Sequence, residues 1–214
     1  KLIKKWGTST HLRDFELLSP EEFHYKNTKY NSELKLPTGY VSLVEVSPYD
    51  LNAKQVWNYL KKRNISKEIV EKYKIGFTTQ GEYKFRIIVP SFNSYGDLQF
   101  FIARSYVNSK LKYKNPEQEK SNLIFNEGHI NWDKDIYLVE GVFDMFFVEN
   151  SIPLLGKVVS DSLWKRLYEE SKGNIIICLD GDAWDDGVRL YEKINGGKLR
   201  GRVKIVKLPD NRDI

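Results

Sequence analysis

The stretch YLVEGVFDMFFVEN, residues 137–150, places two carboxylates in the most hydrophobic neighbourhood of the chain. Glu140 follows the apolar run 137–139, and Asp144 interrupts a second apolar run four residues later. A charge is costly to bury unless it is paired, hydrogen-bonded or bound to a cation. The pattern therefore indicates that these carboxylates lie at the rim of a core or hold something positive.

Composition places the chain among globular proteins. Its 214 residues are 41% hydrophobic and 14% aromatic, which is enough for one large domain or two small ones. No apolar run approaches the roughly 20 residues that span a bilayer, and the basic start lacks the apolar segment of a signal peptide. Because the first residue is Lys, we expect an excised fragment. With one cysteine, Cys178, and three scattered histidines, the sequence excludes an internal disulfide, disfavours zinc and fits a reducing cytoplasm.

The net charge of +5 is unevenly distributed. Residues 1–120 carry 21 Lys and Arg against 13 Asp and Glu, a net charge of +8, whereas residues 121–214 carry 13 against 16, a net charge of −3. A basic half beside an acidic half suits an enzyme that grips a polyanion with one part and binds cations with the other. Ordinary surface charge is an equally open explanation.

The first 130 residues contain three kinds of segment. Residues 1–50 show no convincing period, and we expect a partly ordered linker there. Residues 50–64 have helical spacing, and Ser66 is a typical N-cap for a second helix that we expect to end at Gly76. The segments YKFRIIVP and LQFFIARSY, joined by a turn-rich connection, predict an antiparallel hairpin followed by a polar loop.

After residue 131, short apolar runs alternate with amphipathic segments, which predicts a parallel sheet with helices on its faces. The strands expected are Ile136–Val139, Leu154–Leu155, Ile175–Leu179 and Val203–Leu208. The helices expected are Phe143–Glu149, Ser162–Glu170 and Gly187–Ile194. The predicted fold class is α/β.

Acidic residues follow three of these predicted strands. Glu140 and Asp144 follow the first, Asp180 and Asp182 follow another, and Asp213 comes after the last, together with Asp210. The carboxyl ends of strands are where open α/β sheets bind ligands. Clustered carboxylates without nearby His or Cys favour Mg²⁺ or Mn²⁺. Strand-end carboxylates are also common as helix N-caps, but E-G-x-x-D combined with D-G-D favours a metal site.

The two acidic motifs carry a family resemblance. VEGVFD and LDGDAW resemble the signature motifs of the Toprim fold, which is shared by DnaG-type primases, topoisomerases and certain nucleases. Four upstream segments and the end of the chain are similar to motifs of DnaG-type primases. The segments are YLKKRNISKEIVEKYKIGF, RIIVP, FIARSY and KYKNPEQEKSNLIFN, and the chain ends with LPDNRDI. The resemblance covers about residues 51–214 and is specific in combination.

The resemblance implies the RNA-polymerase core of a primase. It implies a mixed αβ subdomain over 51–132 and a C-terminally truncated Toprim subdomain over 133–214, with helices on both faces of its sheet. The implied activity is nucleotidyl transfer, the metal-dependent synthesis of short RNA primers on single-stranded DNA from NTPs. A replicative helicase is the implied partner, and the cytoplasm, of the host if phage-encoded, is the implied location.

The resemblance also implies roles for individual residues. The implied catalytic and metal-binding set is Glu140, Asp144, Asp180 and Asp182, with Asp213 as a further metal ligand. The basic residues that match nucleotide- or template-contacting positions are Arg86, Arg104, Lys112 and Lys120. This chain departs from the family in GDAWDDG, which leaves open whether Asp185 or Asp186 joins the cluster.

The sequence context of the basic residues also indicates possible contacts, independently of the resemblance. Arg104 interrupts an aromatic strand and needs an anionic partner, unless it lies on the exposed face. Lys112, Lys114 and Lys120, interleaved with Tyr113, suit a loop that contacts nucleic acid, although a solvated loop is as compatible with any one lysine. Two other functions stay open: a Toprim nuclease or topoisomerase fragment, and a non-catalytic nucleic-acid-binding module.

Overall fold

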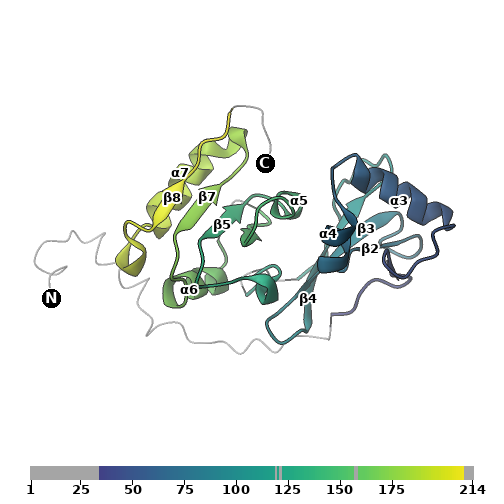
Figure 1. Ribbon diagram of the computed structural model, residues 1–214, viewed down its shortest axis with the longest axis horizontal. Coiled ribbons are helices and arrows are strands. Elements are labelled where there is room, and N and C mark those ends of the chain that lie inside the picture. Colours follow the sequence, from purple (N-terminus) through teal and green to yellow (C-terminus); the bar gives the residue numbers. More distant parts are fainter. Residues whose placement is uncertain (1–33, 119, 121, 157–158, 210–214) are drawn as a thin grey trace, which may run out of the picture. The chain divides into compact units, whose positions relative to one another are not determined.

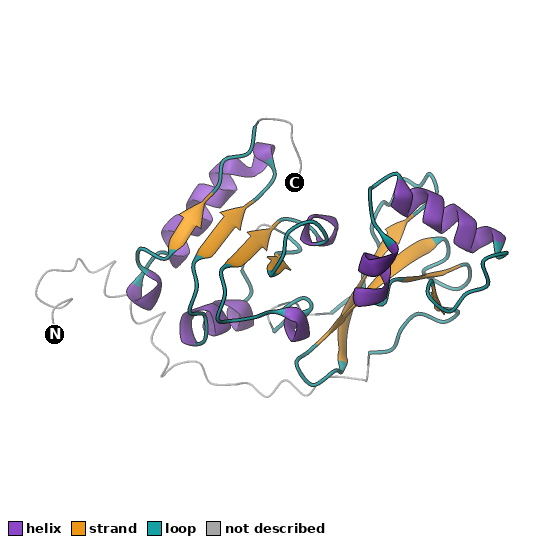
Figure 2. Cartoon of the chain, in the orientation of Figure 1, coloured by secondary structure: helices purple, strands orange, loops and turns teal. Residues whose placement is uncertain are grey.

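A computed structural model describes residues 34–118, 120, 122–156 and 159–209 (Figure 2). Within this part the strands form two four-stranded sheets, in the orders β1-β2-β3-β4 and β6-β5-β7-β8. The first is antiparallel and the second is parallel. The predicted α/β class is therefore confirmed.

The antiparallel sheet contains the predicted hairpin. Its strands are β1 (Val41–Ser42), β2 (Gly76–Thr78), β3 (Arg86–Phe92) and β4 (Leu98–Ser105). Arg86 pairs with Ser105 at one end of the hairpin, and Phe92 pairs with Leu98 at the other, after a register shift. Pro90 is tolerated in β3 because the pairing with β2 ends at Ile88, so no β2 ladder bond needs its missing N–H.

Two helices lie between β1 and β2 in the chain, α3 (Leu51–Lys61) and α4 (Lys67–Lys72). Ser66 accepts the Ile69 N–H over 3.4 Å, so the predicted N-cap is confirmed. The prediction that Gly76 ends the second helix is wrong. Lys74, with φ 49°, turns the chain, and Gly76 begins β2, where a Cβ would crowd the Val41 carbonyl of the neighbouring strand.

The parallel sheet follows the predicted alternation (Figure 1). Its strands are β5 (Ile136–Val139), β6 (Ser151–Pro153), β7 (Ile175–Cys178) and β8 (Val203–Ile205). β5 has the predicted bounds, and β7 and β8 are shorter than predicted. The strand predicted at residues 154–155 is wrong, because β6 ends earlier and Leu155 has φ 52°, a left-handed conformation that a strand does not adopt.

Three helices accompany this sheet: α5 (Val142–Met145), α6 (Asp161–Glu169) and α7 (Trp184–Ile194). α5 is shorter than predicted because turns follow it, up to Asn150 at φ 54°. α7 begins three residues earlier than predicted, directly after a 3₁₀ turn at Gly181–Ala183. α6 and α7 share a core with Leu138, whereas α5 shares one with Val139, which points to the opposite face.

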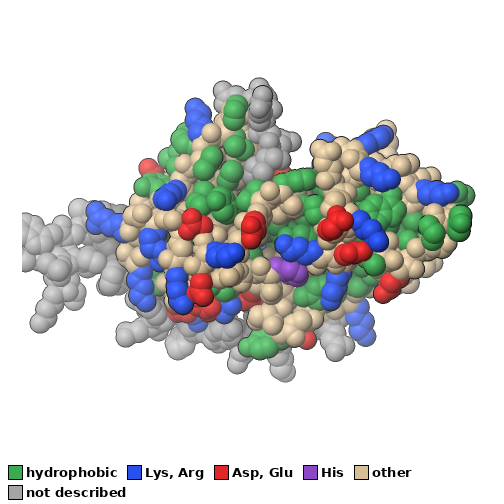
Figure 3. Space-filling view, in the orientation of Figure 1, with side chains coloured by type: hydrophobic (Ala, Val, Ile, Leu, Met, Phe, Trp, Pro, Cys, Tyr) green, Lys and Arg blue, Asp and Glu red, His purple; other side chains and the backbone are tan. Residues whose placement is uncertain are grey.

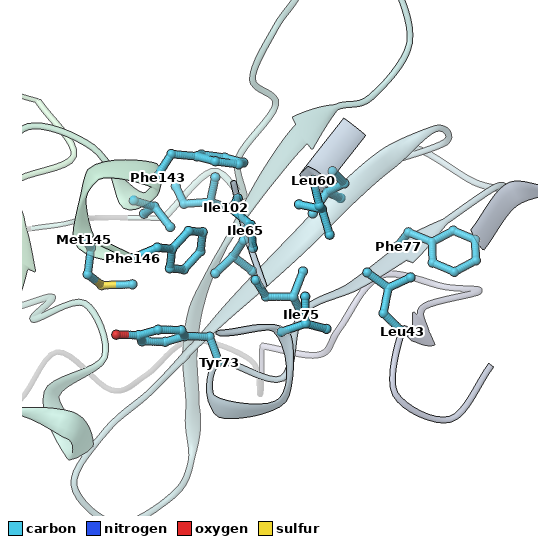
Figure 4. Packing of buried hydrophobic residues seen from close by; sticks show 14 of the residues in the cluster. Leu43, Leu60, Ile65, Tyr73, Ile75, Phe77, Ile102, Phe143, Met145 and Phe146 are labelled. Carbon is cyan, nitrogen blue, oxygen red and sulfur yellow. The ribbon is translucent and has the colours of Figure 1, made fainter. Parts of the chain in front are cut away.

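One hydrophobic cluster joins α5 to the antiparallel sheet and its helices. Phe143, Met145 and Phe146 lie in it beside Leu60 and Ile102 (Figure 4). Residues on both sides of position 132 therefore share a core, and the predicted division there stays a prediction. Among the described residues, none of the helices has the length and apolar character that crossing a bilayer requires.

Candidate active site

The carboxyl ends of β5 and β7 bring Glu140 and Asp180 to one edge of the sheet. Val139 of β5 pairs with Cys178 of β7. Glu140 is the next residue after Val139, and Asp180 comes two residues after Cys178. Both side chains are half-buried, and Glu140 Oε2 and Asp180 Oδ1 are themselves shielded from solvent. The strand order thus places these two carboxylates at neighbouring strand ends, and the predicted cluster of all the acidic residues stays a prediction.

Asp144 stands at the start of α5 and also has a structural task. Its Oδ2 accepts the backbone N–H of Gly141 over 2.7 Å, in the arrangement of a capping box. The N-cap of α5 is Gly141 and not a carboxylate, and Asp144 stabilises the start of the helix from the third helical position. A cap and a ligand role are compatible, since a carboxylate has two oxygens and several lone pairs.

The pKa of the Cys178 thiol is affected by the negative charge at this edge of the sheet. Burial raises its pKa, and the negative charges of Asp180 and Asp144 raise it further. Two carboxylates from different strand ends therefore act on the same point at the end of β7. This negative potential is what a cation would meet at the edge.

The donor set suits a divalent metal, although no assembled site is present in the described part of the chain. Glu140, Asp144 and Asp180 offer the hard oxygen ligands that Mg²⁺ and Mn²⁺ prefer. Within the described residues, no three His, Cys, Asp or Glu side chains are grouped closely enough to hold an ion. Asp182 is exposed in the 3₁₀ turn, and Asp213 lies outside the described residues. The metal assignment stays a prediction.

Asp185 and Asp186 occupy the first turn of α7. Asp186 forms an ion pair with Arg189 over 3.7 Å, and Asp185 is exposed. Both carboxylates suit the positive end of the helix dipole. The structure thus gives them a helix-stabilising role, and their membership of the cluster stays open.

A second group of side chains, which we call the arginine–aromatic cluster, borders this edge. Its members are Tyr59, Arg63, Arg104, Tyr113 and Phe143. Arg63 Nε and Arg104 Nε both donate to the Tyr59 hydroxyl, each over 3.0 Å. Their guanidinium groups lie 5.1 and 6.0 Å from the centre of the Phe143 ring. Arg104 also lies 4.5 Å from the Tyr113 ring.

The arginine–aromatic cluster has the character of an anion site. Arg63 and Arg104 converge on one hydroxyl, and no described carboxylate forms an ion pair with either. Two guanidinium groups held together with no carboxylate partner in the described part of the chain favour binding of a phosphate. Phe143 belongs to α5 and directly precedes Asp144, so the cation group and the carboxylate group adjoin each other in the chain.

Arg63 was not among the predicted site residues. The signal available was its spacing from Tyr59, because residues four apart share a helix face. The contact with Phe143, eighty positions later, had no local signal. Arg104, in contrast, was predicted to need an anionic partner. In the described structure it contacts the Tyr59 hydroxyl and the Tyr113 ring instead.

Arg86 does not fit the prediction of a direct contact with nucleotide or template. Its side chain is 7% exposed and donates to the carbonyls of Ala103, Leu111 and Lys112, at 3.0 to 3.3 Å. Burial lowers the pKa of its guanidinium. Arg86 therefore fixes the segment around Lys112 against β4, because it satisfies backbone groups from both.

The three predicted lysines differ in their surroundings. Lys112 is exposed, beside the bridge that pairs Tyr113 with Arg104. Lys114 forms an ion pair with Glu82 over 2.9 Å. Lys120 lines a mainly apolar cavity of about 340 Å³ beside β6 and α6. Lys112 and Lys120 are thus available to an anion, whereas Lys114 already has an acidic partner.

Comparison with known proteins identifies the relatives of this arrangement. No protein-family model matches the chain. The DNA primase of Buchnera aphidicola subsp. Baizongia pistaciae is 30% identical over 190 residues, covering 77% of this chain and 31% of that protein. A DNA primase domain from Pseudomonas aeruginosa superposes with a TM-score of 0.68 at 23% identity, covering 81% of this chain and 69% of that one.

In sequence the chain is similar to a DNA primase, and it has the fold of the DnaG catalytic core. A DnaG primase catalytic domain bound to single-stranded DNA has a TM-score of 0.64 and 21% identity, with 77% of this chain and 68% of that chain covered. The similarity in fold to this catalytic domain thus extends over about three quarters of the chain. The chain spans about a third of the length of the curated relative that it matches.

Proposed function

We propose that the chain is the catalytic core of a DNA primase that makes short RNA primers on single-stranded DNA. The observation that carries the proposal is the adjacency of the arginine–aromatic cluster and the carboxylates, joined at Phe143–Asp144. Phosphoryl transfer needs cations to bind the phosphates and carboxylates to hold divalent ions, and this junction offers both. The similarity to DnaG-type primases supports the same assignment.

The proposed chemistry joins two ribonucleotides on the template. The 3′-hydroxyl oxygen of one forms a bond to the α-phosphorus of an incoming triphosphate, and the bond from that phosphorus to the pyrophosphate breaks. The hydroxyl proton passes to a base, for which Glu140 is the proposed acceptor. Arg63 and Arg104 bind the triphosphate through charge-assisted hydrogen bonds.

The proposal includes a divalent cation, Mg²⁺ or Mn²⁺, as in the Toprim motifs that the sequence resembles. Glu140, Asp144, Asp180 and Asp182 would hold it, with Asp213 as a further ligand. When bound, such an ion neutralises phosphate charge and lowers the pKa of an attacking oxygen. Lys112 and Lys120 are proposed contacts for the template strand.

Two further elements belong to this proposal and rest on the family alone. A replicative helicase, fused or separate, would deliver the single strand. The cytoplasm would be the place of action.

Primer synthesis tests the proposal directly. The protein is incubated with radiolabelled NTPs, a mixed single-stranded template and Mg²⁺ or Mn²⁺, and short oligoribonucleotides are expected. Asp180→Asn should reduce product at least about a hundredfold, since one missing group of this kind typically costs that much. Glu192→Gln, which removes the same charge from an exposed position of α7, should stay within about threefold of the parent.

The outcomes separate the alternatives. Cleavage of labelled DNA with Mn²⁺, without any product from NTPs, would identify a Toprim nuclease instead. Binding of single-stranded DNA without either reaction would leave the non-catalytic module. An Asp180→Asn protein that still makes primers at the parental rate contradicts the assigned carboxylate site.

A further inference from the structure

A second cavity, which we call the loop cavity, shares no residue with the candidate active site. It has a volume of about 260 Å³ and lies among the end of α4, the turn after β3 and the 3₁₀ turn η2 (Glu127–His129). Its lining residues are Lys72, Tyr73, Lys74, Phe92, Asn93, Ser94, Gly96, Asn126, Gly128 and His129. No carboxylate is among them.

Aromatic rings hold the two lysines at the wall of this cavity. Lys74 Nζ lies 4.6 Å from the centre of the Phe92 ring, and Lys72 Nζ lies 4.9 Å from that of Tyr73. Contacts of this kind attract ammonium groups to ring faces. The two cations are thereby placed by contacts from both sides of the cavity, since Phe92 ends β3 and Tyr73 caps α4.

Close approach of two loops gives the cavity its form. A Cβ on Gly128 would lie 3.2 Å from the Asn93 carbonyl oxygen, so η2 and the turn after β3 nearly touch. Asn93 Oδ1 accepts the N–H groups of Tyr95 and Asp97, each over 2.9 Å, and keeps that turn folded. A preformed wall of this type loses little entropy when a ligand binds.

The loop cavity has a positive potential. Neither Lys72 nor Lys74 forms an ion pair within the described residues, and the nearby carboxylates of Glu71 and Glu127 pair with other cations. The His129 ring stacks 5.5 Å from that of Tyr73. Burial lowers the pKa of His129, and the charges of Lys72 and Lys74 lower it further. A hydrogen bond to the backbone of Lys72 acts in the opposite direction and raises the pKa of His129 in part.

We propose that the loop cavity binds the phosphate group of a nucleotide, with Lys72 and Lys74 contacting the phosphate and the accessible rings of Phe92 and His129 contacting the base. Charge and aromatic faces together are the recognition chemistry of nucleotides. The volume, slightly below the usual range for small-molecule sites, suits a single nucleotide unit. This unit is either a free nucleotide or one residue of a single strand, which share the phosphate chemistry.

The imidazole of His129 supplies the readout. Its ¹H–¹³C NMR signal is assigned by its loss in His129→Gln, and its pKa is measured with pyrophosphate, with a ribonucleoside triphosphate or with a short oligothymidylate. A phosphate in the cavity should shift the signal saturably and raise the pKa of His129, because the anion offsets the two lysines. Lys74→Gln should weaken the affinity about tenfold, the value of one lost charge-assisted hydrogen bond.

The control removes a lysine elsewhere. Basic and acidic side chains alternate over the face seen in Figure 3, so general attraction of anions must be separated from binding in the cavity. Lys193→Gln, at an exposed position of α7, removes the same charge and should leave the affinity unchanged. The Lys74 and Lys193 variants should have equal stability, as expected for exposed lysines.

Each outcome of these titrations either supports or overturns the proposed binding site. Saturation by the triphosphate identifies a free nucleotide, and saturation by oligothymidylate alone identifies a strand; both support the proposal. It is overturned if no probe shifts the His129 signal saturably, or if Lys193→Gln weakens binding as much as Lys74→Gln does. Neither result bears on primer synthesis, which is assigned to other residues.

Discussion

The Arg63 guanidinium lies 5.1 Å from the centre of the Phe143 ring, and Asp144 is the next residue in the chain. Phe143 is therefore the link between a cation that can bind phosphate and a carboxylate that can hold metal. It is 7% exposed, as its neighbour Phe146 is 8% exposed, and the two rings pack at 5.6 Å. This pair offers a test of the link with a matched control.

Phe143→Leu should lower primer synthesis about tenfold. The substitution keeps an apolar side chain in the core, so the free energy of unfolding should fall by only about 1 kcal/mol. It removes the ring face that both arginines approach, so the two guanidinium groups are held less firmly in place for a phosphate. Phe146→Leu should cost similar stability with little loss of activity. Equal activity losses in the two variants would show that Phe143 acts through packing alone.

Asp144 should show two separable roles. Asp144→Asn retains an oxygen that can accept the Gly141 N–H, so the helix cap survives and stability should change by less than about 0.5 kcal/mol. Asp144→Ala removes the cap and should cost about 1 kcal/mol. Both variants should lose primer synthesis if the charge holds a metal. Thermal unfolding and primer assays on the pair decide this, and an active Asp144→Asn protein would restrict Asp144 to capping.

Arg86 should behave as a structural residue. Arg86→Lys loses the planar fork that reaches three carbonyls, and the free energy of unfolding should fall by about 2 kcal/mol. Lys112→Gln, at an exposed position, should leave stability within about 0.5 kcal/mol and weaken binding of single-stranded DNA. Denaturant titration and filter binding on both variants provide the comparison. A stable Arg86→Lys protein with weak DNA binding would restore the direct contact.

Local patterns predicted the elements whose causes are local. β5 has its predicted bounds because a four-residue apolar run is flanked by Asp135 and Glu140, and the Ser66 cap depends only on Ile69 three residues on. Gly76 was misjudged because the left-handed residue that ends the helix is Lys74, a residue type that rarely adopts that conformation.

The site was predictable where strand ends determine it and not where distant segments meet. Glu140 and Asp180 follow adjacent strands, so their proximity depends on the alternation of strands and helices. The buried position of Arg86 depends on carbonyls more than 15 residues away. The contact between Arg63 and Phe143 likewise depends on tertiary packing, which periodicity does not encode.

Gly173 should be indispensable to the edge from which β5 and β7 begin. A Cβ there would overlap the backbone of Lys134 and Asp135, which lie directly before β5. Backbone atoms at the start of a central strand have little room to move, so Gly173→Ala should cost about 3 kcal/mol and lower Tm by roughly 6–12 °C. Gly196→Ala is the matched control, since its Cβ would meet no atom within 4 Å and its φ of −140° suits any residue. Calorimetry should therefore show a large loss for the first variant and almost none for the second, and equal Tm values would mean that the two loops before these strands are not packed as described.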